Sequence, residues 1–212
     1  MNGKRWRVAV LVAAAFIVAC HPTHSPVPAA SDTAQNSLAI TDRLPYLSAQ
    51  QLAEGLAAAP ILPPIKQLQP PFDSLSFDKA IAYDYNGAKG EPTLYIVEDG
   101  RLAPTVLAQQ PLGQQEVAAV LGLLSSRRAY GDAPAFCFEP HLGIVLYRAD
   151  TVVGHLSICI SCKRLASSPA LPPGIFRLIQ MQDGPSYPAD GLNDRALLQL
   201  RKWLKQWQFR LF

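Results

Sequence analysis

Apolar residues recur along this chain at spacings of three and four in three places, which predicts three helices. In the first, Ser48 and Gln51 fit a capping box, and Pro60 ends the helix. The second follows Gly113 and runs through Arg127. The third begins near Asn193. Their expected buried stripes are Leu52, Leu56 and Ala59; Val117, Val120, Leu121 and Leu124; and Leu197, Leu200, Leu204 and Trp207.

Between these helices, alternating or short apolar runs bounded by turn residues predict strands. Asp99-Gly100 is a strong cue for a hairpin turn. The predicted strands are 76–85, 93–97, 101–108, 142–147, 152–160 and 175–181. This order of elements predicts an α+β fold, a single small domain with a largely antiparallel sheet and about three helices.

The two strands 142–147 and 152–160 form a predicted hairpin whose register decides which residues meet. A three-residue loop, Ala149 to Thr151, places Ile144 opposite Leu156. A two-residue loop shifts the pairing by one and splits the apolar residues between two faces. We therefore expect the three-residue loop, which unites Leu142, Ile144, Leu146, Leu156, Ile158 and Ile160.

This register gathers chemically active side chains at one end of the hairpin. His141 lies opposite Cys159, Cys137 lies one pleat further on the same side, and Cys162 lies just past the strand end. A disulfide from Cys137 to Cys159 or to Cys162 would close a loop of roughly 20–25 residues and contribute about 3 kcal/mol on the chain-entropy model.

Two other chemistries suit the same residues. Cys137, His141, Cys159 and Cys162 supply the four ligands of a Cys3His zinc site. Alternatively, Cys159-x-x-Cys162 is a thiol redox motif, although such motifs normally head a helix, and residues 163–168 allow at most two turns before Pro169. Disulfide, zinc site, redox pair and free thiols remain open at this point.

The first twenty residues resemble a targeting signal. Three basic residues, Lys4, Arg5 and Arg7, precede an apolar run over 8–19. A basic segment followed by a short apolar one is typical of a secretory signal peptide. Twelve apolar residues are too few to cross a membrane, which needs about 20. Ile-Val-Ala-Cys, ending at Cys20, resembles the lipobox of bacterial lipoproteins. The resemblance implies cleavage before Cys20, acylation of Cys20 and, with His21 next, sorting to the outer membrane.

We therefore expect a signal peptide over 1–19, a lipidated N-terminus with a flexible tether rich in Pro, Ser and Thr over 20–43, and a folded domain over 44–212. Residues 1–19 hold three of the 19 basic side chains and none of the 16 acidic ones. The remaining chain has no net charge, which argues against binding nucleic acid. The expected partners are the membrane and an envelope protein.

A second resemblance lies at the cysteines. CFEPHLGIVLY, from Cys137, and HLSICISC, to Cys162, are similar to a segment of uncharacterised bacterial secreted proteins and lipoproteins. Its pattern is C-[FY]-x-P-x-[HN]-[AG]-[IV] followed by [IV]-C-x-x-C. The matching residues are Cys137, Pro140, Gly143, Cys159 and Cys162. The resemblance implies a shared structural element and no known activity.

No motif of a nucleophilic hydrolase, a zinc protease, a phosphate-binding loop or a dinucleotide-binding fold occurs in the sequence. The sequence thus favours a non-catalytic, membrane-anchored lipoprotein with a binding or envelope-associated role. A periplasmic thiol-disulfide oxidoreductase that uses Cys159 and Cys162 is the alternative.

Overall fold

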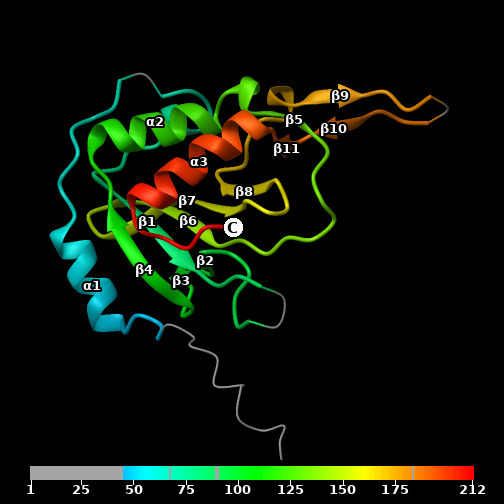
Figure 1. Cartoon of the computed structure of the whole chain (residues 1–212). Coiled ribbons are helices and arrows are strands. Elements are labelled where there is room, and N and C mark those ends of the chain that lie inside the picture. The colour runs from blue at the N-terminus through cyan, green and yellow to red at the C-terminus, as the bar shows by residue number, and fades with distance from the viewer. Residues whose placement is uncertain (1–44, 67, 89–90, 183) are drawn as a thin grey trace, which may run out of the picture. The chain divides into compact units, whose positions relative to one another are not determined.

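The computed structural model describes residues 45–212, apart from 67, 89–90 and 183. The predicted signal peptide, the tether and Cys20 lie outside the described residues. Within them the chain folds into a small α+β domain, as the sequence predicts (Figure 1).

A five-stranded antiparallel sheet forms the centre of this domain, with the strand order β4-β1-β6-β7-β8. Three shorter strand pairs accompany it: β2 with β3, β5 with β11, and β9 with β10. The bounds of the sheet strands are β1 Lys79–Tyr85, β4 Val106–Pro111, β6 Leu142–Arg148, β7 Thr151–Cys159 and β8 Arg164–Ser168. Those of the short pairs are β2 Val97–Glu98, β3 Arg101–Leu102, β5 Tyr130–Asp132, β9 Arg177–Ile179, β10 Tyr187–Ala189 and β11 Gly191–Leu192.

The described part of the chain contains three α-helices, and all three were predicted: α1 (Ala49–Ala58), α2 (Gln114–Leu124) and α3 (Asp194–Gln206). The capping box of α1 is confirmed, since the Ser48 hydroxyl accepts a hydrogen bond from the Gln51 N–H and the Gln51 side chain accepts one from the Ser48 N–H. Asn193 caps α3 by accepting from the Ala196 N–H at 3.0 Å.

Each face of the sheet is covered by a different set of elements. Helices α2 and α3 lie on the first face (Figure 1), where their predicted stripes pack against Ile144 and Leu156. Helix α1 and the β2–β3 hairpin cover the second face, where Tyr83 and Tyr147 share a buried hydroxyl–hydroxyl hydrogen bond of 2.8 Å. Strand β1, which the sequence predicted within residues 76–85, is therefore buried along its whole length.

The predicted strands outside the central hairpin are only partly correct. Residues 93–97 and 101–108 were expected to form one long hairpin, but only β2 and β3 pair there, around the Asp99-Gly100 turn. The main sheet takes β4 instead, which pairs with β1. Sequence patterning also missed β8, because its short polar segment follows the cysteines without an apolar alternation.

The hairpin β6–β7 has the predicted register over most of its length, with Leu142 opposite Ile158 and Ile144 opposite Leu156. The loop was predicted wrongly. It has two residues, Ala149 and Asp150, both with positive φ. One extra residue in β7 then shifts the pairing next to Tyr147, and this bulge restores the register that unites the apolar side chains.

Gly143 on β6 allows the chain that leads into β2 to cross close above the sheet. A Cβ atom at this position would lie 2.4 Å from Cγ1 and 2.7 Å from Cβ of Ile96. The Ile96 N–H also donates a hydrogen bond of 2.9 Å to the buried Ser157 hydroxyl on β7. Gly143, one of the residues that match the second resemblance, thus has a packing role.

We predict that Gly143→Ala destabilises the domain by about 1–3 kcal/mol, since the added methyl group has no space. The matched control is Gly122→Ala within α2, where an added Cβ meets nothing within 4 Å. There the substitution should stabilise by about 1 kcal/mol through helix propensity. Urea unfolding measures both values. Equal effects of the two substitutions would contradict the close crossing at Ile96.

Candidate functional site

Cys159 and Cys162 form a disulfide in the turn between β7 and β8. Cys159 ends β7, and the turn is closed by a hydrogen bond of 3.3 Å from the Lys163 N–H to the Ile160 carbonyl. The Lys163 ammonium group holds this turn in place through Asp132 at 2.7 Å. Neither half of the disulfide has solvent-exposed surface.

This pairing corrects the predicted disulfide, which joined Cys137 to Cys159 or Cys162. A tight turn at the end of β7 sets the Cα atoms of Cys159 and Cys162 5.3 Å apart, within the usual range for a disulfide. The three sulfur atoms lie at one end of the hairpin, as the predicted register requires, but Cys162 is folded back beside Cys159 rather than extending beyond the strand.

Cys137 nevertheless lies at the disulfide. Its Sγ atom is 3.0 Å from Sγ of Cys162. The loop that carries it crosses the β7–β8 turn, because the Ala135 N–H donates a hydrogen bond of 3.0 Å to the Cys162 carbonyl. Unlike the two bonded cysteines, Cys137 is exposed and is a free thiol.

His141 does not join the sulfur atoms. Its ring stacks on Phe212, with the ring centroids 3.9 Å apart. Among residues 45–212, apart from the four positions left undescribed, no group of three or more His, Cys, Asp or Glu side chains is arranged to hold a metal ion. The structure therefore does not support the Cys3His zinc site, since the disulfide engages two of its sulfur atoms and the imidazole is stacked elsewhere.

The helix that a reactive C-x-x-C motif normally heads is also missing here. The residues after Cys162 continue as strand β8, so no helix N-terminus faces either sulfur atom. An external protein thiol cannot reach the disulfide directly, since both cysteines are fully buried. This geometry suits a structural disulfide better than a catalytic one.

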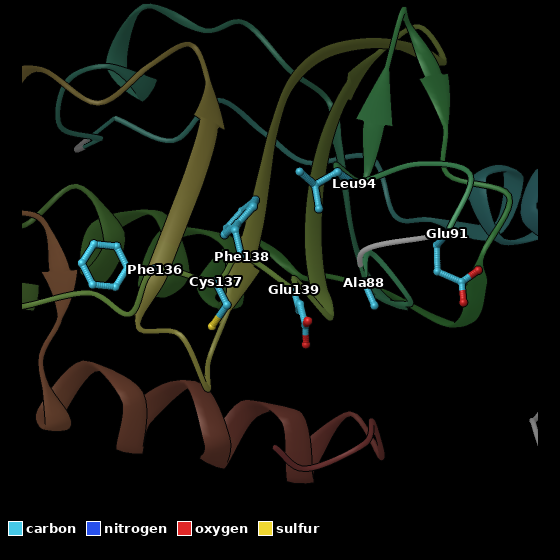
Figure 2. A pocket seen from close by; sticks show the side chains of 7 residues that line it. All are labelled: Ala88, Glu91, Leu94, Phe136, Cys137, Phe138 and Glu139. Carbon is cyan, nitrogen blue, oxygen red and sulfur yellow. The ribbon is translucent and has the colours of Figure 1, made fainter. Parts of the chain in front are cut away.

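A pocket of about 440 Å³ opens beside the loop that carries Cys137 (Figure 2). Figure 2 shows Phe138 rising toward Leu94, while Cys137 and Glu139 point to the other side of the loop. The Phe138 ring lies 5.8 Å from the Tyr95 ring and 5.9 Å from the Arg164 guanidinium carbon. The pocket is lined by Ala88, Glu91, Leu94, Phe136, Cys137, Phe138 and Glu139.

The far end of the same loop is fixed at Pro140. The Gly87 N–H donates a hydrogen bond of 3.0 Å to the Pro140 carbonyl. A Cβ atom on Gly87 would lie 2.5 Å from the Leu94 carbonyl oxygen, so only glycine allows this approach. Gly87 therefore joins the segment that carries Leu94 to the loop that carries Pro140.

Residues 210–212 pack on the sheet through a partly buried ion pair that the sequence did not predict. Asp84 on β1 is buried and accepts from the Arg210 side chain, with Nη2–Oδ1 at 2.6 Å, and from the Arg210 N–H at 3.0 Å. The Phe212 ring contacts both the Arg210 guanidinium, whose carbon lies 5.0 Å from the ring centroid, and the stacked His141 ring. An aspartate between two tyrosines in a predicted strand was the signal, because a buried carboxylate requires a partner.

The imidazole groups of His141 and His155 are both shifted toward the neutral form. Burial, followed by the nearby Arg210 charge, lowers the pKa of His141, while the Tyr85 backbone and then the Asp84 and Glu139 charges oppose the shift. Burial alone lowers the pKa of His155 on β7. Nδ1 of each ring is buried without a hydrogen-bond partner, which is consistent with burial as the main cause of both pKa shifts.

Comparison of this chain with protein-family models, with curated proteins and with solved structures gave no match. In the part of the chain that the structure describes, none of the helices has both the length and the apolar character needed to cross a membrane.

We predict that Asp84→Asn lowers the free energy of unfolding by about 2–3 kcal/mol, since it removes charge-assisted hydrogen bonds at a buried site. Asp194→Asn is the control, because the Asp194 carboxylate is 90% exposed and Lys163 keeps its contact with Asp132. The control should change the free energy by less than about 1 kcal/mol. Urea unfolding compares the two, and equal losses would contradict a special role of the Asp84–Arg210 pair.

We also predict that the domain loses stability as the pH falls through the histidine range. Below about pH 6.5 the unfolded chain binds a proton that folded His141 resists, so the free energy of unfolding decreases until the pH passes the lower pKa of the folded state. His141→Gln should reduce the difference in unfolding free energy between about pH 7.5 and about pH 5. His24→Gln, in the predicted tether, should leave it unchanged. An unaltered difference in His141→Gln would show that this ring is freely protonated in the folded state.

Proposed function

We propose that this chain is an exported, lipid-anchored lipoprotein whose folded domain has a non-catalytic binding or envelope-associated role. The observation that carries the proposal is the fully buried Cys159–Cys162 disulfide. Disulfides persist in oxidising compartments such as the bacterial periplasm and are rare in the cytosol. A structural disulfide therefore supports the export that the N-terminal sequence predicts.

The proposed anchor is acylated Cys20. A basic start, an apolar run of twelve residues and a small residue before Cys20 support cleavage at that point. Two or more acyl chains on the new N-terminus hold a protein stably at a membrane, whereas a single chain does not. His21 after the lipidated cysteine favours the outer membrane.

The proposed binding surface is the pocket beside the cysteines. Its wall carries Leu94 and Phe138, and Phe136 is fully exposed at its edge. An exposed aromatic side chain next to an apolar hollow suits the apolar side chain of a partner, for which an envelope protein is the expected class.

The second candidate function is a periplasmic thiol-disulfide oxidoreductase. The contact between Cys137 and the disulfide favours it. The burial of Cys159 and Cys162 and the strand that follows them disfavour it, because a substrate protein must reach a sulfur atom of the motif. The non-catalytic role is therefore the better supported of the two.

We predict that Cys20→Ala abolishes incorporation of a clickable fatty acid and moves the chain out of the membrane fraction, since the substitution removes the acylated sulfur. His24→Gln, four residues further along, should keep both the label and the membrane fraction. In-gel fluorescence and fractionation of the expressing cells measure the two properties. Recovery of the wild-type chain from cytosol, starting at Met1 and without acyl mass, would overturn the proposal.

A further inference from the structure

The cysteine that stays free is in contact with one particular half of the disulfide. Cys137 Sγ lies 3.0 Å from Cys162 Sγ, well beyond the bonded length of about 2.05 Å but close enough for reaction. Thiol–disulfide exchange proceeds by attack of a thiolate on one sulfur atom of a disulfide. Cys137 Sγ is therefore within reach of Cys162 Sγ.

The loop that carries Cys137 is fixed on both sides of it. Before Cys137, the Ala135 N–H binds the Cys162 carbonyl, and after it the His141 N–H donates a hydrogen bond of 3.1 Å to the Ile158 carbonyl. These bonds tie the loop to β7 and to the turn that holds the disulfide. The sulfur–sulfur contact is thus built into the backbone arrangement.

The other half of the disulfide has donors that suit a leaving group. The Cys162 N–H donates to Cys159 Sγ at 3.2 Å, and the Ser161 hydroxyl lies 3.5 Å from the same sulfur atom. Hydrogen bonds to the charged form of a group favour that form. Both donors would stabilise the Cys159 thiolate after the bond to Cys162 breaks, and a more stable thiolate leaves faster.

We propose that Cys137, Cys159 and Cys162 form one thiol–disulfide exchange site in which Cys162 is the shared sulfur atom. The Cys137 thiolate attacks Cys162 Sγ, and a Cys137–Cys162 bond forms. The Cys159–Cys162 bond breaks, and its electron pair leaves with Cys159. The proton that Cys137 released to solvent returns to Cys159, so the exchange consumes no oxidant or reductant.

This exchange moves the disulfide between a buried and an exposed position. In the Cys159–Cys162 pairing neither residue is accessible, whereas the Cys137–Cys162 pairing has Cys137 at the pocket. A small external thiol then attacks Cys137 Sγ and forms a mixed disulfide, with Cys162 leaving as a thiolate. A second thiol attacks the external sulfur of that mixed disulfide, which releases the oxidised small disulfide and the reduced cysteines. The class of reactant is therefore a thiol that enters at the pocket.

The experiment uses the full-length chain in a Cys20→Ala background, so that a fourth thiol takes no part and the outcome does not depend on lipidation. Each variant is equilibrated in a glutathione redox buffer, quenched with acid and alkylated before and after reduction. Peptide mass spectrometry then locates the free thiols. Circular dichroism verifies that each variant is folded.

Cys137→Ser should retain the Cys159–Cys162 disulfide, and Cys159→Ser should form Cys137–Cys162. Cys162→Ser should leave Cys137 and Cys159 free, since it removes the shared sulfur. Two free thiols in folded Cys159→Ser, or a Cys137–Cys159 disulfide forming as readily in Cys162→Ser, would overturn the proposal.

A rate measurement keeps the proposal testable even where a variant fails to fold. Glutathione should reduce the disulfide of folded Cys137→Ser about tenfold or more slowly than that of the chain with Cys137, because the accessible route is lost. Equal reduction rates would show that the thiol reaches the turn directly, without exchange through Cys137.

Discussion

The arrangement of this domain depends on the register of the hairpin β6–β7. A slip of one residue would turn Ile144 and Leu156 to opposite faces and expose half of the apolar side chains beneath α2 and α3. The bulge in β7 prevents this slip, because it compensates for a loop of two residues. The cost of exposing the core therefore fixes where β7 ends, and with it the position of Cys159.

That end point brings together the features that define the site. Since β7 stops at Cys159, the following residues turn back and bury Cys162 beside it. The loop before β6 must then pass over the turn, which sets Cys137 against the disulfide and leaves Phe136 and Phe138 around a pocket. A structural requirement of the sheet thus produces a sulfur cluster with one buried pair and one accessible thiol.

Local patterns predicted those parts of the fold that local interactions determine. The cap at Ser48, the start of α3 near Asn193 and the stripe of Leu197 and Leu200 follow from hydrogen bonds and spacing within single helices. The apolar residues of β6 and β7 fixed their register even though the loop length was wrong. Both faces of β1 are covered by elements distant in sequence, so its alternation could not reveal its burial.

At the candidate site, too, local patterns predicted some features, while others depend on contacts between distant parts of the chain. The sequence placed the three cysteines at one end of the hairpin, but their pairing depends on the fold of the β7–β8 turn, for which no periodicity exists. His141 stacks on Phe212 because the Asp84–Arg210 ion pair holds residues 210–212 against β1.

The most direct test of the account is NMR of the isotopically labelled protein. The register described here predicts cross-strand proton contacts between Ile144 and Leu156 and between Leu142 and Ile158. Contacts of Ile144 with His155 and of Leu142 with Ser157 would mean a slipped register and would contradict the account.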